Sequence, residues 1–118
     1  MKIISHRGYW KSELEKNTEI AFRRSFNLGF GTETDIRDLD GKLVISHDMP
    51  HSKDGLLSIE EFFEIYNEFQ GNPPLALNIK SDGLQGLIGE AVKKYKISNY
   101  YLFDMSIPDT LVTKKAGL

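Results

Sequence analysis

Cysteine is absent from this chain of 118 residues, so the chain forms no disulfide and offers no thiolate to a metal ion. Oxygen and imidazole groups are then the only strong metal ligands, which favours a hard cation or no metal. Long apolar runs are missing too. No stretch approaches the roughly 20 apolar residues that cross a bilayer, and none follows Lys2 as in a signal peptide. We therefore expect a cytoplasmic protein that does not insert into membranes.

A strong excess of charge of either sign is also lacking. Fifteen Lys and Arg residues stand against seventeen Asp and Glu residues, which gives a formal net charge of −2. Proteins that bind nucleic acid or anionic membranes through bulk charge are usually basic, so neither partner is expected here. Any anion that the protein binds must be met by local groups, and the length predicts no more than one domain, spanning residues 1–118.

Extended and helical patterns alternate along the chain. Short runs rich in apolar residues predict strands at 2–5, 31–36, 42–46, 75–79 and 99–103. Apolar residues at the helical period predict helices at 18–28, 59–69, 84–95 and 107–115. Asp40-Gly41 is typical of a tight turn and predicts a hairpin between the second and third strands. This order predicts an α/β protein whose sheet is mainly parallel with helical crossovers.

Four βα units in 118 residues correspond to about the first half of a TIM-type (βα)8 barrel, which typically needs about 250 residues. The last residues, 116–118, look like a helix end followed by the start of another strand, so we expect a truncated or fragment chain. A small open α/β sheet is the alternative. A half-barrel that formed the whole protein would leave an open edge and an apolar face exposed, which would favour a homo-oligomer.

Polar residues stand at the ends of successive predicted strands. Active sites of barrels and open α/β sheets lie at the carboxyl ends of parallel strands. The residues at those positions are His6, Asp35, His47, Lys80 and Asp104. We expect them to share one rim of the sheet.

The charged residues inside these strands are hard to explain as ordinary surface groups. Glu33 and Asp35 lie two residues apart, so their side chains share a face about 7 Å apart along the strand. An inward charge such as Glu33, Asp35 or Lys80 is costly unless it has a partner. Taken singly, however, a Glu-x-Asp pair is usually a solvated strand face, and a His-Arg-Gly tripeptide is usually a turn.

Five motifs together give a specific resemblance. They are His6-Arg7-Gly8, Asn17-Thr18 with Ala21-Phe22, Gly29-x-Gly31-x-Glu33-x-Asp35, Asp40-Gly41 leading to residues 44–48, and Asn78-Ile79-Lys80. In this pattern, which covers nearly the whole chain, the sequence resembles the glycerophosphodiester phosphodiesterase family. That family shares a TIM-type barrel with the phosphatidylinositol-specific phospholipases C.

The resemblance implies hydrolysis of a small-molecule glycerophosphodiester to glycerol 3-phosphate and an alcohol, assisted by Ca²⁺ or Mg²⁺. It also implies a role for each matched residue. The general acid/base pair would be His6 and His47, the phosphate ligands Arg7 and Lys80, and the metal carboxylates Glu33 and Asp35.

The chain departs from the family pattern at position 78. The family usually has a third metal-binding glutamate there, whereas this chain has Asn78, whose amide oxygen can bind a hard cation but brings no charge. Asp104 could supply the missing carboxylate, because it ends the next strand. A smaller departure is Lys16, where the family often has glutamate. The alternative function is therefore a non-catalytic relative that binds a phosphorylated ligand.

Overall fold

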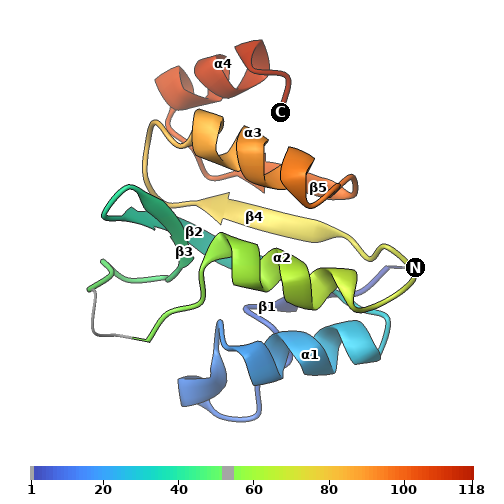
Figure 1. Ribbon diagram of the computed structural model, residues 1–118. Coiled ribbons are helices and arrows are strands. Elements are labelled where there is room, and N and C mark those ends of the chain that lie inside the picture. Colours follow the sequence, from blue (N-terminus) through green and yellow to red (C-terminus); the bar gives the residue numbers. More distant parts are fainter. Residues whose placement is uncertain (1, 52–54) are drawn as a thin grey trace.

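Strands and helices alternate along the chain in this computed structural model, which describes residues 2–51 and 55–118 (Figure 1). The strands are β1 (Ile4–His6), β2 (Gly31–Leu39), β3 (Lys42–Ile45), β4 (Leu75–Ile79) and β5 (Tyr100–Phe103). The helices are α1 (Glu19–Asn27), α2 (Ile59–Asn67), α3 (Gln85–Lys94) and α4 (Ile107–Lys115), with a short 3₁₀ helix η1 (Glu13–Glu15) before α1. The predicted order of elements is confirmed, and only η1 was not expected.

The sheet is mainly parallel, with strand order β1-β2-β4-β5. Strand β3 pairs antiparallel with the carboxyl-terminal half of β2, from Ile36 opposite Ile45 to Leu39 opposite Lys42. Asp40 and Gly41 both have positive φ, 52° and 78°, as the tight turn of such a hairpin requires. The predicted hairpin is therefore confirmed.

The hydrophobic core lies between the sheet and the helices α1, α2 and α3, which cover one face of it (Figure 1). Phe22 of α1 and Phe62 of α2 are fully buried, with ring centroids 4.7 Å apart. Leu75 and Leu77 of β4 meet them from the sheet. Because side chains alternate along a strand, Asn78 faces away from these helices, toward the other face of the sheet.

The start of α2 shows how local sequence fixes an element. Ser58 accepts a hydrogen bond from the Glu61 backbone N–H, and the Glu61 carboxylate accepts one from the Ser58 N–H. This reciprocal capping box satisfies two backbone donors that the first turn leaves free. The helices in the described part of the chain are all too short or too polar to cross a bilayer.

Candidate active site

Asp35 of β2 is fully buried and stands at the centre of a polar cluster. Its Oδ2 atom lies 3.0 Å from Nε of Arg7 and accepts a hydrogen bond from Nδ2 of Asn17 at 2.9 Å. Its Oδ1 atom lies 3.8 Å from Nζ of Lys80 and 3.7 Å from Nδ1 of His47. We call these five residues the Asp35 cluster. A buried carboxylate is tolerated here because two permanent cations face it.

The sheet register brings these side chains together. Asp35 of β2 pairs with Asn78 of β4, so Lys80, two residues after Asn78, points to the same face one step further along. The Ser46 backbone N–H donates to the Asp35 carbonyl at 3.0 Å, which holds the start of the segment carrying His47 on β2. The predicted gathering of strand-end residues on one rim is thus borne out for Asp35, His47 and Lys80.

Arg7 enters the cluster from the end of β1. Its backbone N–H donates to the Glu33 carbonyl at 2.8 Å, and its φ is 58°, so the chain turns sharply after the strand. Its Nη2 atom lies 2.8 Å from Nδ1 of His47. The same nitrogen lies 3.4 Å from Nε2 of His47, so the guanidinium group lies against the imidazole ring. One arginine therefore contacts both the buried carboxylate and an imidazole.

Asn17 is the site residue to which the sequence reasoning gave no role. Its Nδ2 atom donates to Asp35, its Oδ1 atom accepts from the Thr34 hydroxyl at 2.8 Å, and its backbone N–H donates to the Arg7 carbonyl at 2.9 Å. The next residue, Thr18, is the N-cap residue of α1. Asn17 is therefore not needed to start the helix. Its presence in the matched motif was the one feature of the sequence that could have indicated a role in the site.

Gly8 lets this first turn pack closely. Its φ is +83°, its backbone N–H donates to the Thr32 hydroxyl at 2.9 Å, and a Cβ atom built there would lie 2.6 Å from Cβ of Ala21. Any other residue would meet both backbone strain and a steric clash with α1. The glycine of the His-Arg-Gly tripeptide is therefore required by packing.

The substitution Gly8→Ala is expected to destabilise the fold by about 2–4 kcal/mol, since overpacking adds to the positive-φ strain. Gly29→Ala is the matched control, because Gly29 also has positive φ, 76°, but no atom lies within 4 Å of the place that its Cβ would take. That variant should lose only about 1 kcal/mol. Urea unfolding measures both losses, and equal losses would contradict the steric account.

Two imidazoles lie on the solvent side of the site. The His6 side chain is 62% exposed, with Nε2 3.9 Å from Oε1 of Glu33, and the His47 side chain is 45% exposed. The Trp10 indole N–H donates to the His6 carbonyl at 3.0 Å and so holds the end of β1. Both histidines are therefore accessible to a ligand, while their backbones are fixed.

A second polar group lies beside the Asp35 cluster and comes from three neighbouring strands. Nδ2 of Asn78, at the end of β4, lies 3.4 Å from Oε2 of Glu33 on β2 and 3.1 Å from Oδ2 of Asp104, just after β5. We call these three residues the Glu33–Asn78–Asp104 group. Burial, reinforced by the neighbouring charge of Asp35, raises the pKa of Glu33 above its usual value.

Some atoms of these residues are of the type that binds a hard cation, but the side chains do not gather into a complete metal site. Oε1 of Glu33, Oδ1 of Asn78 and Oδ1 of Asp35 are buried oxygen atoms that accept no hydrogen bond. Such oxygens are the donors that Ca²⁺ and Mg²⁺ prefer. However, no three His, Asp or Glu side chains gather closely enough to form a metal cluster within the described residues. The predicted metal ligands therefore stay a prediction.

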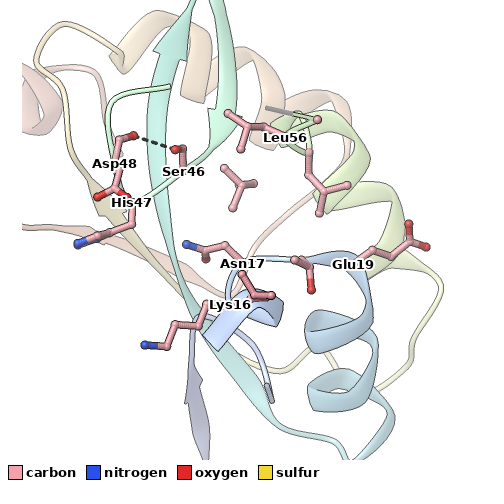
Figure 2. A pocket seen from close by; sticks show the side chains of 12 residues that line it. Lys16, Asn17, Glu19, Ser46, His47, Asp48 and Leu56 are labelled. Atoms are coloured by element: carbon pink, nitrogen blue, oxygen red, sulfur yellow. Dashed lines mark hydrogen bonds between the residues drawn. The ribbon is translucent and has the colours of Figure 1, made fainter. Parts of the chain in front are cut away.

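A cavity of about 470 Å³ opens beside the Asp35 cluster (Figure 2). Asn17 and His47 belong to the cluster and also line the cavity. The other lining residues come from the segments 14–19, 45–48 and 55–57. Ser46 and Asp48 are tied together at its edge, since the Ser46 hydroxyl donates to the Asp48 carbonyl at 2.8 Å. Lys16 and Glu19 also line it, so the cavity carries both signs of charge.

Comparison with solved structures identifies the architecture. A candidate glycerophosphodiester phosphodiesterase from Galdieria sulphuraria superposes with a TM-score of 0.81 at 22% identity, over 97% of this chain and 60% of that one. A glycerophosphodiester phosphodiesterase from Agrobacterium tumefaciens gives 0.76 at 17% identity, over 98% of this chain and 62% of that one. This chain has the fold of a glycerophosphodiester phosphodiesterase.

The chain spans about three fifths of the length of these two phosphodiesterases, so it forms a partial TIM barrel. The predicted (βα)8 family is confirmed, and the small open sheet is not the better description. At these identities the likeness is one of fold. No family model matches the sequence, and no curated protein matches it either.

Proposed function

We propose that this chain carries the active site of a metal-assisted phosphoric diester hydrolase, which cleaves glycerophosphodiesters to glycerol 3-phosphate and an alcohol. One observation carries the proposal: Arg7, Lys80 and His47 converge on Asp35 at the rim where His6 also lies. Two cations and two imidazoles are the groups that phosphodiester cleavage needs. The phosphodiesterase fold supports this assignment.

Arg7 and Lys80 would bind the phosphate. Their side chains are 17% and 23% exposed, so each cation is partly desolvated yet reachable from the rim. Asp35 holds both in place before a ligand arrives. Preorganised cations of this kind offset the charge that grows on the phosphoryl oxygens in the transition state.

His6 and His47 would transfer the protons. One imidazole removes the proton of the glycerol 2-hydroxyl, whose oxygen attacks phosphorus, and the other gives a proton to the leaving alcohol oxygen. The roles then reverse as water opens the cyclic phosphate to glycerol 3-phosphate. A bound divalent cation, Ca²⁺ or Mg²⁺, would supply Lewis-acid stabilisation of the phosphate. The cavity beside His47 offers room for a small alcohol.

The test is release of glycerol 3-phosphate from glycerophosphocholine, assayed with Ca²⁺, with Mg²⁺ and with a chelator. Release is expected with a cation and should fall by at least about a hundredfold with the chelator, because the Lewis acid supplies several kcal/mol. Adding the cation back in excess should restore it. An equal rate of release with and without the chelator would contradict the role of the cation.

The alternative is a relative that binds a phosphorylated ligand without turnover, and Asn78 favours it. A family site with glutamate at this position would have one more negative charge, and cation affinity depends on the number of charged ligands. Binding of glycerophosphocholine without any release of glycerol 3-phosphate, with either cation, would favour this alternative over the hydrolase.

A further inference from the structure

Asp109 of α4 is a buried charged residue to which the proposed chemistry gives no role. The residue is only 6% exposed, and its Oδ2 atom accepts no hydrogen bond. Within residues 2–51 and 55–118, no lysine or arginine forms an ion pair with its carboxylate. A buried carboxylate without a cationic partner is costly, so its retention needs a reason.

The hydrogen bonds of the Asp109 carboxylate go to the connection between β4 and α3. Helix α4 lies beside α3 (Figure 1), and Oδ1 of Asp109 accepts from the Gly83 backbone N–H at 2.9 Å and from the Gln85 side-chain amide. The Ser106 hydroxyl, at the N-cap of α4, donates to Oδ1 of Asp82 at 3.2 Å. We call the two contacts Asp109–Gly83 and Ser106–Asp82 the α4 clamp. The start of α4 therefore holds two successive residues of this connection.

The same connection begins with Lys80, which we propose as a phosphate ligand. Its backbone N–H donates to the Ile36 carbonyl on β2 at 3.0 Å, which fixes the point where the chain leaves the sheet. The α4 clamp holds the chain again at residues 82 and 83. The backbone of Lys80 thus lies between an anchor on the sheet and an anchor on α4.

The position of the Lys80 charge depends on this support. Its Nζ atom lies 3.8 Å from Oδ1 of Asp35, which is longer than a hydrogen bond, so the ion pair alone leaves the ammonium group some freedom. A lysine ammonium is a point charge on a flexible four-carbon stem. Because a binding group is effective only in the correct geometry, a shift of the supporting backbone should weaken its contact with a phosphate.

We propose that Asp109 is a positioning residue for the phosphate site. By holding Gly83, it fixes the connection that carries Lys80 and so raises the affinity of the site for a phosphate group. The inference rests on the proposed function, which makes Lys80 a phosphate ligand. The alternative is a purely structural contact between α3 and α4, which would change the stability of the fold but not its affinity for phosphate.

The experiment is calorimetric titration of inorganic phosphate into the full chain and its variants, under conditions in which circular dichroism shows each of them to be folded. Asp109→Ala should weaken phosphate binding by about threefold to tenfold, since a displaced cation loses part of its contribution. Asp109→Asn should recover most of this affinity, because it keeps an oxygen that can accept from the Gly83 N–H.

Thr113→Val is the matched control. The Thr113 hydroxyl accepts from the Gln85 amide at 3.1 Å, so its loss loosens the contact between α3 and α4 but leaves the α4 clamp intact. Urea unfolding should show a lower stability for this variant, while its phosphate affinity should equal that of the wild type.

A double-mutant cycle separates positioning from structure. Lys80→Ala should itself weaken phosphate binding by about tenfold or more, as expected for a hydrogen bond to a charged group. Adding Asp109→Ala to it should change the affinity by less than about twofold, because Asp109 acts through a lysine that is no longer there. If Asp109→Ala does not fold, Ser106→Ala replaces it in the cycle, since it removes the other contact of the α4 clamp.

Wild-type phosphate affinity in the clamp variant, or an equal loss of affinity with and without Lys80, would overturn the inference. A wild-type chain that binds no phosphate would overturn it too.

The two proposals fail in different ways. Phosphate affinity that depends on Asp109 through Lys80, without any release of glycerol 3-phosphate, would contradict the proposed function alone. Release of glycerol 3-phosphate together with wild-type phosphate affinity in Asp109→Ala would contradict the positioning role alone.

Discussion

His47→Gln is expected to lower the rate of glycerol 3-phosphate release by about a hundredfold to ten-thousandfold, the range for loss of a general acid or base. Glutamine keeps polar atoms near Arg7 but cannot exchange a proton near neutral pH. The fold should be unaffected, because the His47 side chain is nearly half exposed and the Arg37 guanidinium holds its backbone carbonyl, with Nη2 at 2.8 Å.

Steady-state kinetics with glycerophosphocholine measures this effect, and His51→Gln is the control. His51 is an exposed histidine four residues away on the same connection. The His51→Gln variant should keep the wild-type rate of release, and its unfolding midpoint should match that of His47→Gln. A His47→Gln variant with wild-type turnover would remove His47 from the proton-transfer pair.

Asp35→Asn is expected to affect both stability and activity. The substitution leaves Arg7 and Lys80 facing a neutral group, and breaking a buried ion pair costs about 3–5 kcal/mol. We expect about 3 kcal/mol, the lower end, because the two cations are partly exposed to water, which relieves some of the cost. Turnover should be lost as well, since the phosphate-binding cations would no longer be fixed.

Asp38→Asn is the matched control for this variant. Asp38 lies three residues further along β2 and is exposed, so its loss should change the free energy of unfolding by no more than about 0.5 kcal/mol. Urea denaturation of the two variants gives the comparison. Equal stabilities would show that Asp35 is not the centre of the cluster.

The fold could be predicted from the sequence because local patterns agree with the tertiary structure. The apolar run at 75–79 became β4 with the same bounds, and the helix predicted from residue 59 became α2, which begins at Ile59. Strand β2 is longer than expected, reaching Leu39, because pairing with β3 supports polar residues such as Asp38 that carry no strand pattern of their own. Such pairing depends on contacts between segments, which periodicity does not encode.

The sequence predicted several of the residues that lie in the site, but not which of them contact one another. Strand ends indicated Asp35, His47 and Lys80, since the carboxyl ends of parallel strands meet at one rim. That Arg7 and Asn17 both reach Asp35 depends on positive φ at each, 58° and 60°, in turns that the sequence does not specify. The metal-ligand role expected for Asp35 and for Asp104 remains a prediction.

The most direct measurement is phosphorus NMR of glycerophosphocholine incubated with the chain and Ca²⁺ or Mg²⁺. The proposed function predicts that the wild type and His51→Gln convert the diester resonance into that of glycerol 3-phosphate, and that His6→Gln and His47→Gln leave it essentially unchanged. An unchanged diester with the wild type, or equal conversion by the wild type and both site variants, would contradict it.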